Sequence, residues 1–474
     1  MLSRLLAALL LFPALAHAAE PLSVGVGTAE ITPPLGYSMS GYFHHRGATG
    51  TLDPLLAKAI VFKQGDVRAA LVVGDVIGID RPLAEAIRSK VEAATGIPAA
   101  NVAVAATHSH TGPNYRADLM KSLAPSASEK ASGYIPQLID GFAAAVIAAD
   151  KHAKPMTLKV GAGHEDGVSF NRRFVLKDGT VRTWANLSQP DVVKAAGPID
   201  PEIGLIGFYA AGGDRPSAAI VNFALHCDTV GGTQYSADYP GHIERVLRKE
   251  LGPNFTSIFA TGPCGDINHA DPTGKPRRSS AEIGEKLATA AAAALPDLTA
   301  TNANLAVKRA VVDVPLQSYT DKELSDAKAL VAERTEGKNV PTTKLARAHA
   351  LLRLERLRTG YLDLGRESEE RIASPEGPRE SLPAEVQVIR LADDTALVTL
   401  PGEIFVELGL AIKEASPFEH TFVIELANDC PAYVPTKKAF EQGGYEANNS
   451  VYAPGGGEKL VETAVELLKE LNAE

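Results

Sequence analysis

Short apolar runs rich in β-branched residues alternate with helix-spaced segments along most of this 474-residue chain. The pattern is clearest where an apolar run (68–75), an amphipathic stretch (82–94) and a second apolar run (101–106) follow one another. It predicts buried strands with a helix packed over them. Further strands are predicted at 157–160, 204–209, 218–225, 257–260, 305–314, 386–391, 396–400 and 422–426. The expected fold class is α/β, with mixed sheets covered by helices.

The segment from about 319 to 371 interrupts this alternation. It is rich in Lys, Arg, Glu, Ala and Leu at helical spacing, most clearly at 345–358. The spacing predicts an inserted helical hairpin. Its many charges are interpreted as a solvated helix face rather than a binding patch.

The first 18 residues have the features of a secretory signal peptide. Arg4 precedes an apolar stretch of about a dozen residues, and Ala16-His17-Ala18 supplies a small-residue cleavage site. No other run approaches the roughly 20 apolar residues that a membrane-spanning helix needs. We therefore expect an exported protein, periplasmic or secreted, without a transmembrane segment. A net charge of −10 without a basic block argues against a nucleic-acid partner, and the oligomeric state is not predicted.

Residues with ligand or acid–base chemistry directly follow several predicted strands. His108 and His110 stand two residues apart after one strand, so both can face one site. His226 closes another strand, and Glu403 follows a third in a Pro-Gly turn at the head of a helix. Each has a plain structural explanation on its own: a loop or surface histidine, a core histidine, a helix N-terminal charge. Together, two histidines and a carboxylate are the usual protein shell of a catalytic zinc ion.

In these residues the chain resembles the neutral and alkaline (non-lysosomal) ceramidases, zinc amidases that split the N-acyl bond of ceramide. The resemblance rests on motifs that occur in family order over nearly the whole mature chain. They are Gly25-Val-Gly-Thr-Ala-Glu-Ile-Thr-Pro-Pro34, Met39-Ser-Gly41-Tyr42, Thr107-His-Ser-His-Thr-Gly-Pro113, Asn171-Arg172, His226, Ser236-Ala-Asp238-Tyr-Pro-Gly241, Gly265-Asp266, Pro401-Gly402-Glu403, Tyr433-Val-Pro-Thr436 and Gly444-Tyr445-Glu446-Ala447. Longer members add a carboxy-terminal β-sandwich domain, so the resemblance implies that residues 19–474 form the catalytic domain.

The resemblance also implies the roles of seven residues. The implied zinc ligands are His108, His226, Glu403 and Tyr433, and the implied residues around the scissile amide are His110, Arg172 and Tyr445. Zinc lowers the pKa of a bound water and polarises the carbonyl. The arginine, histidine and tyrosine side chains can then stabilise the developing oxyanion and protonate the leaving amine.

One position departs from the family pattern. Members usually read Asn-x-Gly-Asp-Val-Ser-Pro-Asn where this chain reads Pro263-Cys-Gly-Asp-Ile-Asn268-His-Ala270. The family serine, to which a nucleophilic or substrate-orienting role is assigned, is therefore Asn268. An amide side chain cannot form an acyl-enzyme. We predict that zinc-activated water attacks, while Asn268 hydrogen-bonds the substrate or the intermediate.

The expected function is an exported zinc-dependent hydrolase that cleaves a linear amide, in an N-acyl lipid or another N-acylated small molecule. Two alternatives stay open. A zinc esterase or phosphoesterase would use the same site, and a binding protein without activity would follow if Asn268 marks a lost function.

The three cysteines fall near the predicted site residues. Cys227 follows His226, Cys264 lies in the altered segment, and Cys430 precedes Tyr433 by three residues. We expect a structural role, for which one disulfide bracing the loops is one form, rather than soft metal ligation; which cysteines would pair is not predicted.

Overall fold

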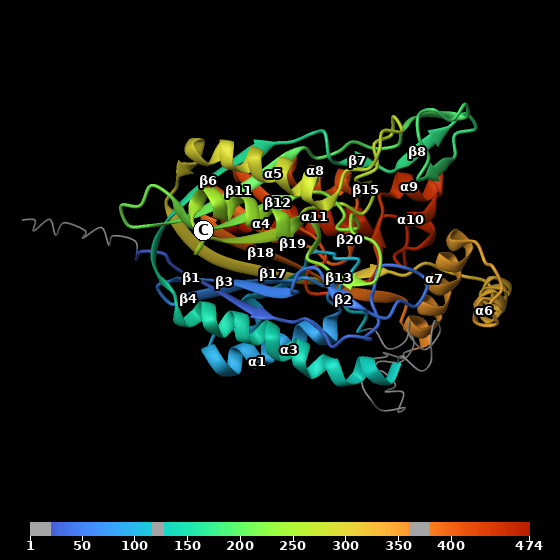
Figure 1. Cartoon of the computed structure of the whole chain (residues 1–474), viewed down its shortest axis with the longest axis horizontal. Coiled ribbons are helices and arrows are strands. Elements are labelled where there is room, and N and C mark those ends of the chain that lie inside the picture. Colours follow the sequence, from blue (N-terminus) through green and yellow to red (C-terminus); the bar gives the residue numbers. More distant parts are fainter. Residues whose placement is uncertain (1–19, 116–127, 360–378) are drawn as a thin grey trace, which may run out of the picture.

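The computed structural model describes residues 20–115, 128–359 and 379–474. Two sheets are stacked with helices outside them, which gives four layers (Figure 1). The larger sheet has the strand order β14-β12-β11-β6-β1-β3-β4-β5, with β16 beside β6, and the smaller sheet has the order β17-β18-β19-β21. Both are mixed sheets, because β4 and β5, β12 and β14, and β19 and β21 run parallel while their other pairs are antiparallel. The expected fold class is confirmed.

The elements have the following bounds. The larger sheet contains β1 (Ser23–Glu30), β3 (Leu56–Gln64), β4 (Val67–Gly74), β5 (Val102–Ala106), β6 (Lys154–His164), β11 (Glu202–Ala210), β12 (Pro216–Phe223), β14 (Thr256–Thr261) and β16 (Thr299–Ala300). The smaller contains β17 (Ala303–Pro315), β18 (Ser381–Ala392), β19 (Thr395–Thr399) and β21 (His420–Ile424). The short strands are β2 (Gly50–Thr51), β7 (Phe170–Asn171), β8 (Arg173–Leu176), β9 (Val181–Thr183), β10 (Val192–Ala195), β13 (Gln234–Tyr235), β15 (Ile267–Asn268), β20 (Glu403–Ile404) and β22 (Tyr433–Val434). The helices are α1 (Arg81–Thr95), α3 (Ser128–Lys151), α4 (Asp238–Leu251), α5 (Ser280–Ala294), α6 (Asp321–Thr335), α7 (Thr342–Thr359), α8 (Val406–Ala415), α9 (Lys437–Gln442), α10 (Tyr445–Asn448) and α11 (Gly456–Asn472).

The two sheets share one apolar core. Ile60 and Leu71 of the larger sheet lie in the same buried cluster as Leu397 and Phe422 of the smaller one. Helices α1 and α3 cover the β1–β5 part of the larger sheet, and α4 and α5 cover β11, β12 and β14. Helices α8 and α11 cover the smaller sheet. Strands such as β5 and β19 are therefore buried on both faces, which explains their uninterrupted apolar sequences.

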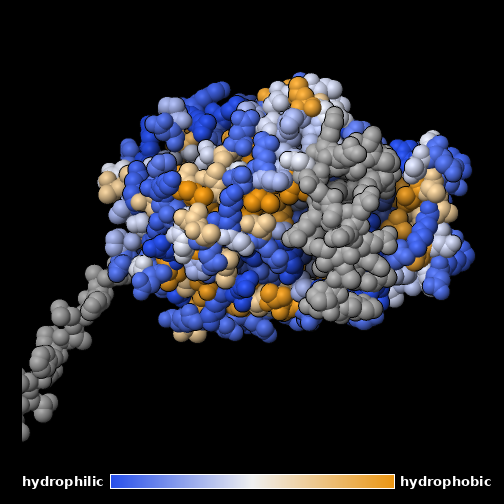
Figure 2. Space-filling model, turned by 90° about the horizontal axis from the view of Figure 1, so that it is seen from below, coloured by the Kyte–Doolittle hydropathy of each residue, from blue (hydrophilic) through white to orange (hydrophobic). Residues whose placement is uncertain are grey.

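Every strand predicted from the sequence is present, as is the predicted helix, which is α1. Helices α6 and α7 form the predicted hairpin and lie at one end of the molecule (Figure 1). The last part of that predicted segment, 360–371, and the predicted signal peptide, 1–18, lie outside the described residues. In the face seen in Figure 2, hydrophilic residues are interspersed with smaller groups of hydrophobic ones. Among the described helices, none combines the length and apolar character needed to cross a bilayer.

Candidate metal centre

Four of the predicted site residues meet where strand ends converge. His108 and His110 follow β5, His226 follows β12, and Glu403 follows β19. The Nε2 atoms of His108 and His226 each lie 3.4 Å from Glu403 Oε2. His110 Nε2 lies 3.3 Å from His108 Nε2. One ligand atom from each of the three histidines lies within 4.8 Å of the others, a spacing at which they could hold one metal ion.

The orientation of two imidazoles is fixed by backbone carbonyls. His108 Nδ1 lies 2.6 Å from the Ile77 carbonyl oxygen, and His226 Nδ1 lies 2.8 Å from that of Cys264. A carbonyl only accepts, so each Nδ1 carries a hydrogen, and in the neutral imidazole each Nε2 keeps a lone pair. Hydrogen bonds of this kind characteristically orient metal-ligating histidines. Both Nε2 lone pairs are therefore directed toward Glu403.

One oxygen of the central carboxylate has no hydrogen-bond donor in the described part of the chain. Glu403 Oε2 is buried and has no hydrogen-bond partner among the described residues. A buried anionic oxygen facing two imidazole lone pairs is costly unless a cation joins them. The donor set thus fits a divalent metal ion.

Tyr433, the fourth predicted ligand, is placed by a short ladder. Strands β20 and β22 pair in parallel, with Glu403 directly opposite Tyr433. The Tyr433 side chain is buried, and its ring centroid lies 5.5 Å from that of Tyr445. Burial, and then the nearby Glu403 carboxylate, raise the pKa of Tyr433 well above its ordinary value.

Local backbone geometry at two residues brings the histidines into this position. His108 has φ of +67°, in the left-handed region that non-glycine residues rarely adopt. Gly41, with φ of +98°, packs against the other imidazole: a Cβ there would lie 2.7 Å from His110 Cβ and Nδ1. Strained conformations persist where the surroundings enforce them, which is common at functional sites.

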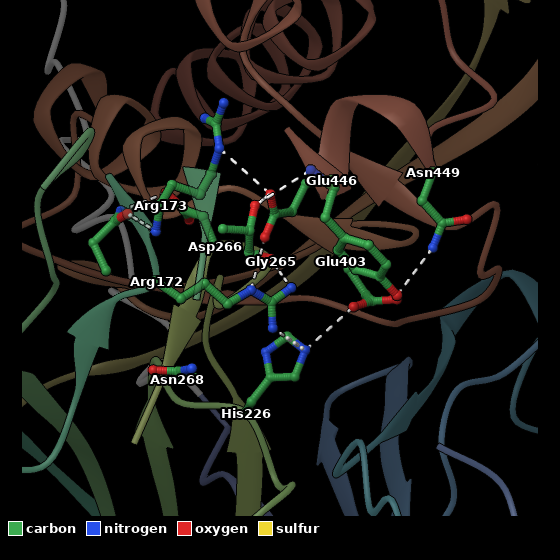
Figure 3. Close-up of polar contacts among 12 residues, drawn as sticks. Arg172, Arg173, His226, Gly265, Asp266, Asn268, Glu403, Glu446 and Asn449 are labelled. Atoms are coloured by element: carbon green, nitrogen blue, oxygen red, sulfur yellow. Dashed lines mark hydrogen bonds and ion pairs between the residues drawn. The ribbon is translucent and has the colours of Figure 1, made fainter. Parts of the chain in front are cut away.

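Arg172 approaches the centre from β7 and β8. Its Nη1 lies 3.2 Å from His226 Nε2, and its Nε donates to Glu446 Oε1 at 2.8 Å (Figure 3). Arginine only donates, which independently requires His226 Nε2 to be unprotonated. Burial alone would lower the pKa of Arg172, but Tyr433 and Glu446 raise it well above its ordinary value. Arg172 thus brings a permanent positive charge to the site.

Two of the histidines, His110 and His226, favour the neutral form. Burial, and then the neighbouring His108, lower the pKa of His110 to about 3. Burial, and then Arg172, lower that of His226. Neutral imidazoles are the form that binds metal ions.

Tyr445 and Asn268 have different hydrogen-bond partners near the centre. Tyr445 begins α10, and its hydroxyl accepts a hydrogen bond from Asn449 Nδ2 at 3.4 Å. Burial, and then Glu403, raise its pKa, so the hydroxyl keeps its proton. Asn268 is buried in β15, where its Oδ1 accepts from the Ala270 backbone N–H at 3.0 Å. None of the interactions drawn in Figure 3 reaches Asn268.

The disulfide that the sequence allowed does not form. All three cysteines are buried and none is disulfide-bonded. Cys264 Sγ donates instead to Glu425 Oε1 at 2.9 Å. The second oxygen of Glu425 accepts from the Ile404 backbone N–H at 2.6 Å. Burial raises the pKa of Cys264 well above its ordinary value, which keeps the thiol protonated as a donor.

Two polar pairs at the site were missed from the sequence. Glu446 is fully buried and also accepts from Thr183 Oγ1 at 2.9 Å. It directly follows Tyr445 within a quoted motif, and the buried arginine it pairs with was itself a predicted site residue. Asp228, two residues after His226, pairs with His269 Nδ1 at 3.0 Å. The proximity of Asp228 to His226 in the chain was the available signal.

Comparison with known proteins identifies the family of the chain. The family model for the N-terminal part of neutral/alkaline non-lysosomal ceramidases matches residues 22–269. The chain belongs to the neutral/alkaline non-lysosomal ceramidase family. The matched part of this ceramidase-family chain contains His108, His110, Arg172, His226 and Asn268.

Similar proteins agree with this assignment. The neutral ceramidase of Pseudomonas aeruginosa is 25% identical over 175 residues, which are 35% of this chain and 24% of that relative. The alignment thus spans about a quarter of the relative's length. The crystal structure of neutral ceramidase from Pseudomonas aeruginosa matches with a TM-score of 0.69 at 21% identity, covering 96% of this chain and 76% of that one. A structure described as ceramidase complexed with C2 matches with a TM-score of 0.68 at 19% identity and the same coverage. The ceramidase-family chain therefore shares their fold.

Proposed function

We propose that the chain is an exported, zinc-dependent hydrolase that cleaves a linear amide bond in an N-acylated lipid or another N-acylated small molecule. The observation that carries the proposal is the convergence of two imidazole Nε2 atoms on one unpartnered carboxylate oxygen. Membership of the ceramidase family supports an amide as the bond that is cleaved. Export is proposed from the first 18 residues of the sequence.

The residues that would hold the metal ion come from four segments. Nitrogen and oxygen donors of this kind suit zinc. The protein ligands would be His108, His226, Glu403 and Tyr433. Bound zinc would polarise the amide carbonyl and lower the pKa of a water molecule.

The remaining residues supply charge and protons. Arg172 stabilises the negative charge that develops on the carbonyl oxygen, because it is permanently charged and held beside His226. His110 Nε2 stands beside the same centre and accepts a proton from the attacking water. The Tyr445 hydroxyl donates its proton to the leaving amine as the C–N bond breaks. The products are a carboxylic acid and an amine.

Asn268 has a supporting role in this scheme. Its Oδ1 is engaged by Ala270, which leaves its Nδ2 group to donate to substrate or intermediate. One such hydrogen bond contributes about 0.5–1.5 kcal/mol, which is roughly two- to tenfold in rate.

The proposal is tested by zinc analysis and a hydrolysis screen of the purified protein against N-acyl amides, including ceramides, and matched esters. We expect amide hydrolysis that survives Asn268→Ala with a loss of at most about tenfold, and that disappears in His108→Ala. Asn302→Ala, at an exposed asparagine, serves as the control. A wild-type protein that binds zinc and lipid amides tightly but hydrolyses nothing would refute the enzyme and leave a binding protein.

The substitution Asn268→Ser, which restores the family serine, tests which substrate the site binds. Asn268→Ser with a large gain on ceramide would indicate a ceramidase activity lost in this chain. No gain, with activity intact on another amide, would assign the asparagine to that other substrate.

A further inference from the structure

An exposed aromatic side chain lies beside the proposed site. Seven large hydrophobic residues are exposed among the described residues, and three of them, Trp184, Leu187 and Val193, fall within ten residues of one another. Trp184 is the only tryptophan in the chain and is 47% exposed.

The backbone of Trp184 is held in an uncommon conformation. Its φ is +60°, in the left-handed region that bulky residues rarely adopt. Its N–H donates to the carbonyl of Arg172 at 2.8 Å, which fixes the turn that follows β9. The indole ring then lies 4.7 Å from the ring of Tyr445, centroid to centroid. The strained turn thus places a half-exposed indole against a residue of the proposed catalytic site.

From Trp184 a continuous set of contacts leads inward to the metal centre. The rings of Tyr445 and Tyr433 lie 5.5 Å apart, and Tyr433 pairs with Glu403 across the short ladder. The guanidinium carbon of Arg172 lies 5.8 Å from the indole and 5.4 Å from the Tyr433 ring. Polar side chains therefore form the buried inner end of this series of contacts, while its exposed outer end is the apolar indole.

We propose that Trp184 is a specificity-determining residue whose indole packs against an alkyl chain extending from the scissile amide. This inference rests on the proposed function and assigns to one side chain the selection for a long alkyl chain on the acyl or the amine side of the amide. An alkyl chain laid on the indole would remove apolar surface of both partners from water, and each buried methylene contributes about fourfold in binding. A short polar substrate would leave the indole exposed.

Tryptophan fluorescence tests the contact without requiring turnover. Because Trp184 is the only tryptophan, selectively excited emission reports on this ring alone. The zinc-loaded wild-type protein is titrated below the critical micelle concentrations with dodecanoate and butanoate, and separately with dodecylamine and butylamine. We expect a saturable blue shift with at least one dodecyl compound and none with the butyl compounds. The responding headgroup tells whether the chain belongs to the acyl or the amine fragment. Absence of a shift with both dodecyl compounds would overturn the inference.

Chain-length selectivity supplies the second test. For Trp184→Ala, the ratio of kcat/KM on long-chain and short-chain N-acyl substrates should fall about tenfold or more, with zinc content unchanged. Trp184→Phe should keep most of the ratio, and Val311→Ala, a 51% exposed residue on β17, should keep all of it. An unchanged ratio in Trp184→Ala on both the acyl and the amine series would contradict the proposal. If the wild type hydrolyses none of these amides, the proposed function fails and the fluorescence titration alone decides the inference.

Discussion

The buried carboxylate of Glu446 offers a sharp test of how the site is held together. It is fully buried, and its two oxygens accept from Arg172 Nε at 2.8 Å and Thr183 Oγ1 at 2.9 Å. Arg173 Nε lies 3.4 Å from the second oxygen. The side chains of Arg172 and Arg173 are each 3% exposed. Water therefore cannot take the place of Glu446 as the partner of either guanidinium.

The expected cost follows from that burial. Removing one partner of a buried ion pair typically destabilises a protein by about 3–5 kcal/mol, because the other charge stays buried and unpaired. We expect that range for Glu446→Ala. For Glu446→Gln, whose amide oxygen still accepts one hydrogen bond, we expect about 2–3 kcal/mol. The turnover rate should fall as well, because Arg172 loses the contact that orients it, while zinc affinity changes little.

Equilibrium urea unfolding of both variants beside the wild type measures the effect. Glu441→Gln, at an exposed position in α9, is the matched control and should stay within about 0.5 kcal/mol of the wild type. Wild-type stability in Glu446→Gln would refute the view that this carboxylate balances two buried arginines.

Two further substitutions probe the packing around the centre. Gly41→Ala would place a Cβ against the His110 imidazole at a positive φ, so we expect turnover to fall at least tenfold with zinc still bound; unchanged kinetics would contradict the assigned position of His110. Burial raises the pKa of Asp75 to about 6, although Lys58 and hydrogen bonds from Leu56 and Thr107 lower it. The folded protein thus holds this proton more tightly than the unfolded chain, so its stabilising contribution is complete below about pH 4 and is lost as the pH rises through about 6. Asp75→Asn should therefore gain up to about 3 kcal/mol relative to the wild type between pH 4 and pH 7; urea unfolding with the same difference at both pH values would refute this.

Strand-end residues were predictable because the strands that carry them are simple to recognise. β5 is buried on both faces, so its sequence is an unbroken apolar run, and His108 and His110 come where that run ends. β1 was not predicted, since Gly25 and Gly27 weaken the strand pattern. Glycine is needed in β1 because helix α3 packs closely against it: a Cβ on Gly25 would lie 2.0 Å from the Ala149 carbonyl oxygen.

Long-range pairings could not be read from the sequence. Arg172 and Glu446 are 274 positions apart, and nothing local indicates that they form one buried pair. The exposed indole of Trp184 depends on a left-handed backbone turn that no sequence rule assigns to tryptophan. The hydrogen bond between Cys264 and Glu425 is another long-range pairing that the sequence does not indicate. The sequence showed only that Cys264 lies near the site, so it could not tell a free thiol from a disulfide.

The central claim is that His108, His226 and Glu403 form one metal centre. The most direct test is to titrate the metal-free protein with zinc in an isothermal titration calorimeter and to count the bound zinc by elemental analysis. The account predicts one zinc ion bound per wild-type chain. His108→Ala, His226→Ala and Glu403→Gln should each lose this binding, while His164→Ala, at a histidine whose side chain is 66% exposed, should keep it. Zinc bound with wild-type affinity and stoichiometry in all three site variants, or no zinc bound by the wild type, would contradict it.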